Sequence, residues 1–150
     1  MKLSTKTPCI GVCSTSISGN VCRGCKRFAH EVIAWNSYTP EQKHSVNQRI
    51  DHLLAQLVRE RIDVYDAPLL EAKLDEQNIR HDKQSSVYLW AFQLLRAGAT
   101  QIDDLGLFGC RLLPRYSEVS LPELKDALDR DFFVLSNAHY ERYFRPPESH

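Results

Sequence analysis

The sequence predicts a mostly α-helical protein with a small cysteine-rich module at its N-terminus. Four cysteines cluster in a short N-terminal segment that shows almost no helical periodicity. From residue 39 onward, apolar residues recur at helical spacing in segments that begin with helix-capping residues. We therefore expect a four-cysteine metal-binding module at residues 1–38, packed on a helical domain at residues 39–150.

The composition is that of an ordinary globular protein. The chain has 150 residues, of which 43% are hydrophobic and 25% are charged, and this length suits one domain with a small appended module. No stretch approaches the roughly 18 uninterrupted apolar residues of a membrane span, and the N-terminus lacks the apolar block of a secretory signal. We expect a cytoplasmic protein without a membrane partner, in which clustered cysteines indicate a metal rather than disulfides.

The cysteine spacing is that of a metal site. Two close pairs follow the pattern C-x3-C-x8-C-x2-C: Cys9, Cys13, Cys22 and Cys25. A turn predicted at Ser18-Gly19-Asn20 lets both pairs face one tetrahedral centre. Four thiolates can hold either an iron–sulfur cluster or zinc, so the spacing leaves both open. His30 could replace one cysteine, but four thiolates already complete the site, and we expect His30 at the surface.

Two helices are predicted directly after the cysteines. Apolar residues at helical spacing predict a short helix over 28–35, and Trp35 should be buried where the module joins the next helix. Thr39 and Gln42 then form a capping box. A long apolar stripe after this capping box predicts a helix over 39–62.

Residues 63–150 predict further helices without suggesting an activity. A helix should start at Asp66, and the polar run 75–84 should be its frayed end and a surface loop. Ser86 should cap a helix that is apolar nearly all round and forms the centre of the core. Gly98 should end that helix in the left-handed conformation.

The last third of the chain is less regular. The apolar stretch 105–113 is either a short strand or an irregular segment. Cys110 lies in this stretch with no base beside it, which predicts a buried and inert thiol. One helix should begin after Ser120, and a separate short helix over 137–144 should dock its aromatic and basic residues on the protein's own core.

Charge and motifs exclude several classes of function. The formal net charge is zero, which argues against a protein that coats nucleic acid or an anionic membrane. Residues 1–38 nevertheless carry five basic residues against one acid, which would offset thiolate charge or face a partner. The sequence contains no phosphate-binding glycine motif, nucleophile elbow or metalloprotease histidine pair, so no catalytic residue is predicted.

The cysteine motif and the residues after it resemble a known family. The matching residues are Pro8-Cys9-Ile10-Gly11-Val12-Cys13, Cys22-Arg23-Gly24-Cys25, Arg27, Glu31 and Trp35. They resemble the small bacterial proteins grouped as domain of unknown function 1289, described as predicted iron–sulfur proteins, over about residues 8–60. The resemblance implies an iron–sulfur cofactor and no particular reaction. Phe28 stands where the family has a small hydroxyl residue, which bears on the capping of the short helix.

These observations lead to two expectations for function. The first is a metal-binding protein with a tetrathiolate centre, which acts as an iron–sulfur accessory or as a redox or sensor protein through a protein partner. The alternative is a zinc-stabilised interaction module that docks protein or RNA and has no redox role. A third hypothesis is an enzyme with its active site in residues 63–150, although no catalytic residues can be identified there.

Overall fold

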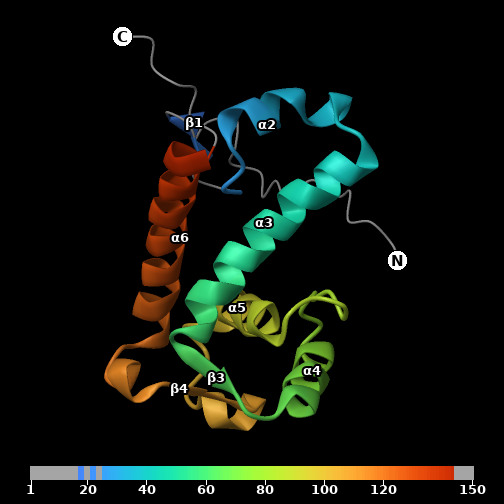
Figure 1. Ribbon diagram of the computed structural model, residues 1–150. Coiled ribbons are helices and arrows are strands. Elements are labelled where there is room, and N and C mark those ends of the chain that lie inside the picture. Colours follow the sequence, from blue (N-terminus) through green and yellow to red (C-terminus); the bar gives the residue numbers. More distant parts are fainter. Residues whose placement is uncertain (1–16, 19–20, 23–24, 144–150) are drawn as a thin grey trace. The chain divides into compact units, whose positions relative to one another are not determined.

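The computed structural model describes residues 17–18, 21–22 and 25–143 (Figure 1). Helices dominate these residues, which confirms the predicted fold class. Within these ranges, none of the helices is long and apolar enough to cross a membrane. The chain divides into two compact units: a first unit of residues 1–53 with 131–150, and a second unit of residues 54–130.

Two short strands and a short helix surround the second cysteine pair in the first unit. β1 (Ile17–Ser18) pairs antiparallel with β2 (Val21–Cys22), as the turn predicted between them requires, although Gly19 and Asn20 lie outside the described residues. α2 (Ala29–Ala34) follows, and the 3-10 helix η1 (Trp35–Ser37) continues it. The short helix predicted over 28–35 is therefore confirmed.

α3 (Pro40–Arg59) begins with the predicted capping box. The Thr39 backbone N–H donates to Gln42 Oε1 at 2.8 Å, and the Gln42 backbone N–H donates to Thr39 Oγ1 at 3.2 Å. Each side chain thus satisfies a backbone donor that the first helical turn leaves without an intrahelical partner.

The prediction that this helix continues to residue 62 is wrong, because α3 ends at Arg59. Ile62 instead begins β3 (Ile62–Val64), which pairs antiparallel with β4 (Cys110–Leu112). Ile62 lies opposite Leu112 in this ladder. Pairing with a strand distant in sequence satisfies the extended backbone here, so it overrides the helical periodicity of the apolar stripe.

α4 (Ala67–Glu76) and α5 (Val87–Gly98) pack together in the second unit (Figure 1). Both have the predicted caps, because Asp66 Oδ1 accepts from the Leu69 backbone N–H at 3.1 Å and Ser86 Oγ accepts from the Tyr88 N–H at 3.2 Å. As predicted, α5 supplies the centre of this unit's core with five buried residues: Trp90, Ala91, Phe92, Leu94 and Leu95.

The predicted left-handed conformation of Gly98 is wrong. Gly98 lies inside α5, and Ala99 after it is still right-handed, with its backbone N–H bonded to the Leu95 carbonyl at 3.0 Å. The left-handed glycine of this unit is Gly109, with φ of +76°. Gly109 joins the 3-10 helix η2 (Leu105–Phe108) to β4, so the stretch 105–113 contains both an irregular part and a short strand.

α6 (Leu121–Tyr143) follows a short 3-10 helix, η3 (Pro114–Tyr116), and is one continuous helix. Its predicted cap is present, because Ser120 Oγ accepts from the Glu123 backbone N–H at 3.3 Å. The prediction of a separate short helix over 137–144 is wrong. No glycine or proline interrupts residues 123–143, so the two apolar segments join without a break.

Candidate metal centre

The structure describes two of the four predicted metal ligands, Cys22 and Cys25. Both are buried in the first unit, and Val32 of α2 packs against them. Cys9 and Cys13 lie outside the described residues. The four-cysteine site therefore stays a prediction, and the structure describes only its second cysteine pair.

Two backbone hydrogen bonds link Cys22 to the residues directly after Cys25. The Lys26 backbone N–H donates to the Cys22 carbonyl at 2.9 Å, and the Cys22 N–H donates to the Arg27 carbonyl at 2.8 Å. Lys26 has φ of +64°, in the left-handed region that side chains with a Cβ rarely adopt. A residue with a strained backbone therefore lies directly after Cys25, and such residues cluster at functional sites.

The Lys26 side chain is itself almost fully buried. Its Nζ lies 5.3 Å from the centroid of the Phe132 ring, which belongs to the part of α6 in the first unit. Contact with an aromatic face stabilises the ammonium group where water is excluded. The sequence contains no signal for the left-handed turn, because glycine or asparagine usually marks such a position and here it is lysine.

Arg27 places a positive charge directly against the Cys25 sulfur. Its Nε–H donates to Cys25 Sγ at 3.2 Å, and the residue is buried. The guanidinium carbon also lies 4.9 Å from the centroid of the Trp35 ring. Trp35 is buried, as predicted, and the Arg27 guanidinium lies over its ring in a cation–π contact. A donor fixed in this way stabilises negative charge on sulfur.

Glu31 connects α2 to the first half of α3. Its two carboxylate oxygens accept from Arg49 Nη1 and Nη2, each at 2.6 Å, in a buried bidentate pair. Glu31 Oε1 also accepts from the Phe28 backbone N–H at 2.8 Å. Glu31 thus makes its half of a capping box, although Phe28 has no hydroxyl to make the other half.

Phe28 is the centre of an aromatic cluster in the first unit. The Arg49 guanidinium carbon lies 3.9 Å from its ring centroid, and the Tyr140 ring meets it edge-on at 5.1 Å. His139 stacks on the same ring at 6.3 Å. Tyr140 therefore docks on the protein itself, as predicted, whereas Phe144 lies outside the described residues. Burial and the nearby Arg49 charge lower the pKa of His139, and Glu31 partly opposes this effect.

Two other candidates behave as predicted. His30 is exposed on α2. Cys110 is fully buried in β4, and its S–H points to the Phe108 carbonyl at 3.6 Å. Burial, with a smaller contribution from Asp63, raises the pKa of Cys110 to about 12. Cys110 is therefore a neutral and inert thiol near pH 7.

Comparison with known proteins identifies the segment that carries the cysteines. Residues 7–54 match the family described as Protein of unknown function (DUF1289). No curated protein and no solved structure matches the chain. The matched segment contains all four predicted ligands together with Arg27, Glu31, Trp35 and Arg49. The resemblance of this segment to the DUF1289 family, first indicated by its cysteine motif, is therefore confirmed.

Proposed function

We propose that Cys9, Cys13, Cys22 and Cys25 hold a metal in a tetrathiolate centre. We further propose that the protein is an iron–sulfur accessory, redox or sensor protein that acts in the cytoplasm through a protein partner. The observation that carries the proposal is the hydrogen bond from the buried Arg27 Nε–H to Cys25 Sγ at 3.2 Å. Hydrogen bonds of this kind orient ligands and tune metal sites.

The charged residues next to the second cysteine pair also suit a four-thiolate centre. Four thiolates around a metal carry net negative charge. Lys26 and Arg27 are buried immediately after the second cysteine pair, so positive charge lies next to the proposed ligands. Positive charge at this position offsets part of the negative charge of four thiolates, which supports the proposal.

The residues around the second cysteine pair have separate roles in this proposal. Val32 and Trp35 limit the access of water, and Arg27 holds positive charge at the sulfur. The pair of Glu31 and Arg49 fixes α2 against α3. A bound iron–sulfur cluster would supply one-electron transfer to this scaffold.

The zinc alternative is favoured by one separate observation. Backbone hydrogen bonds link Cys22 to Lys26 and Arg27, on the far side of Cys25 in the sequence, and the C-x2-C spacing of the two cysteines is typical of structural zinc sites. In this alternative the metal contributes folding free energy to a module that docks protein or RNA.

Elemental analysis of the full chain purified without oxygen tests both versions. We expect iron and acid-labile sulfide, with absorption in the visible, and we expect C22S and C25S to lose the metal. C110S is the matched control and should keep it. Colourless wild-type protein with one zinc per chain would favour the alternative, whereas protein without any bound metal would overturn both.

A further inference from the structure

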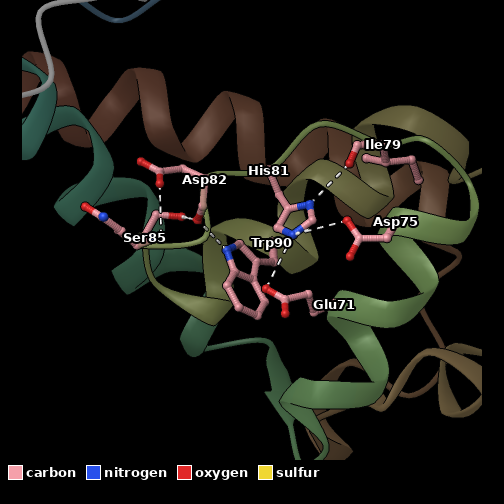
Figure 2. A network of polar contacts seen from close by, with 8 residues as sticks. Glu71, Asp75, Ile79, His81, Asp82, Ser85 and Trp90 are labelled. Atoms are coloured by element: carbon pink, nitrogen blue, oxygen red, sulfur yellow. Dashed lines mark hydrogen bonds and ion pairs between the residues drawn. The ribbon is translucent and has the colours of Figure 1, made fainter.

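A second polar cluster lies in the second unit, around a buried histidine (Figure 2). His81 belongs to the loop 77–86 between α4 and α5, and its side chain is only 3% exposed. The Trp90 ring of α5 meets the imidazole edge-on, with centroids 5.2 Å apart. The predicted surface loop therefore buries one of its residues.

Backbone interactions hold the loop in this place. Asn78 has φ of +58°, and the Ile79 backbone N–H reaches back to the Leu74 carbonyl at 2.9 Å, which turns the chain sharply at the end of α4. On the other side of His81, the Asp82 carbonyl accepts from Trp90 Nε1–H at 2.7 Å. His81 is thus fixed between α4 and α5 from both sides.

The two ring nitrogens of His81 have different surroundings (Figure 2). Nδ1 lies 3.2 Å from the Ile79 carbonyl oxygen, which can only accept, so Nδ1 carries a hydrogen. Nε2 is buried and has no hydrogen-bond partner within the described residues. It faces Glu71 Oε2 at 3.6 Å and Asp75 Oδ1 at 4.0 Å, and both of these atoms are acceptors.

In a neutral imidazole this arrangement points the Nε2 lone pair at two carboxylates. A positive charge between the three groups removes this repulsion. A metal-ligating histidine donates one ring N–H to a group such as a backbone carbonyl, as His81 Nδ1 does, and binds the metal through its other nitrogen. Glu71 and Asp75 are four residues apart and therefore lie on the same face of α4.

We propose that His81 Nε2, Glu71 and Asp75 form a binding site for a divalent first-row transition-metal ion. Nitrogen and carboxylate ligands lie about 2.0–2.2 Å from such an ion, so two ligand atoms of one ion can lie up to about 4 Å apart. The 3.6 and 4.0 Å distances are within this limit.

The carboxylates of Glu71 and Asp75 must turn toward His81 to complete the site. Within the described residues, no three side chains already surround one point closely enough to hold an ion. The side chains of Glu71 and Asp75 are 33% and 56% exposed, so they can turn toward an ion that enters from solvent. His81 is the fixed ligand of this site, because the loop and Trp90 hold its ring in place.

Binding of Mn²⁺ to the full-length protein tests the proposal. Mn²⁺ prefers oxygen and nitrogen ligands to thiolates, so its binding does not depend on the cysteine centre or on the proposed function. Electron paramagnetic resonance of added Mn²⁺ should show about one bound ion per chain, and the Trp90 indole N–H resonance should broaden. Wild-type protein that takes up no Mn²⁺ at millimolar concentration would overturn the site.

Three conservative variants locate the ion. E71Q, D75N and H81Q should each weaken Mn²⁺ binding at least tenfold. E76Q is the matched control, because Glu76 is also on α4 but pairs with Lys73 instead, and it should bind as wild type does. Unchanged binding in both E71Q and D75N would overturn the assignment. These two substitutions are at partly exposed positions, so the test holds even if H81Q fails to fold.

Discussion

Gly109 is a position where the backbone leaves no choice of residue. Its φ is +76°, and a Cβ built on it would lie 2.4 Å from the Asp66 carbonyl oxygen. The backbone N–H groups of Tyr65 and Asp66 both donate to the Gly109 carbonyl at 3.1 Å, which ties the start of α4 to this turn. A Cβ on residue 109 would push the Gly109 carbonyl away from the N–H groups of Tyr65 and Asp66, to which it is hydrogen-bonded.

G109A should therefore lower the free energy of unfolding by more than about 2 kcal/mol, because left-handed strain and a backbone clash add together. Urea denaturation followed by circular dichroism measures this. G98A is the control: Gly98 is helical and a Cβ there meets nothing within 4 Å. Alanine at that helical position should stabilise the protein by roughly 0.5–1 kcal/mol. An equal effect of the two changes would contradict this account.

The Cys110 thiol makes stability depend on pH in the alkaline range. Its pKa is raised from 9.0 to about 12 in the folded protein, so the unfolded chain releases the proton first as pH rises. The folded state then binds more protons than the unfolded state, and the free energy of unfolding falls between these two pH values.

Urea denaturation at two pH values measures this effect. Between about pH 8 and about pH 10, the wild type should lose about 1.4 kcal/mol more than C110A, because this range is centred on the unfolded pKa of 9.0 and each pKa unit corresponds to about 1.4 kcal/mol. The other titrating groups are shared by both proteins and cancel in the difference. A C110A protein with the same pH dependence as the wild type would show that this thiol is not held protonated.

At the scale of elements, the mostly buried ion pair of Glu31 and Arg49 connects α2 to α3. E31Q removes the carboxylate charge of this bidentate pair and should cost on the order of 3 kcal/mol of stability, because the mostly buried Arg49 guanidinium loses its attraction to Glu31. E76Q removes the same charge from a solvent-exposed pair and should cost less than about 1 kcal/mol. Thermal unfolding of both variants compares them, and a small loss in E31Q would contradict a structural role for the pair.

Helix starts could be predicted from sequence because capping is local. Thr39, Asp66, Ser86 and Ser120 each bond a backbone N–H two or three residues ahead, so the signal lies within one turn of the chain. Two errors occurred at helix ends, at residues 59–62 and at Gly98, and a third was the break predicted before residue 137 inside α6. Ile62 leaves the helical pattern because it pairs with Leu112, fifty residues away, and no local signal reports that contact.

At the scale of the whole chain, the C-terminal part of α6 belongs to the same unit as the cysteine segment. The sequence predicted the cysteine site through spacing alone, but not the residues that α6 brings to it. Phe132 and Tyr140 reach Lys26 and Phe28 across more than a hundred residues. The burial of His81 was not predicted either. The loop around it is polar, and its ring is buried because the chain turns sharply at Asn78.

Y140A should therefore weaken the cysteine segment as well as α6. Loss of the edge-on contact with Phe28 should cost about 1–2 kcal/mol of stability, and it should speed the release of bound metal to a chelator. V134A is the control on the same helix, because Val134 is exposed and should leave both measurements unchanged. Metal release at the wild-type rate in Y140A would show that α6 does not support the site.

X-ray absorption at the edge of the bound metal tests the central claim most directly, since it counts the atoms that coordinate the metal in the full-length protein. The account predicts four sulfur neighbours per metal, at about 2.3 Å if the metal is zinc. In C25S the spectrum should lose one sulfur neighbour or the metal altogether, while C110S should be identical to wild type. A coordination shell of nitrogen and oxygen in the wild-type protein, or four sulfurs retained in C25S, would contradict the assignment of Cys25 as a ligand.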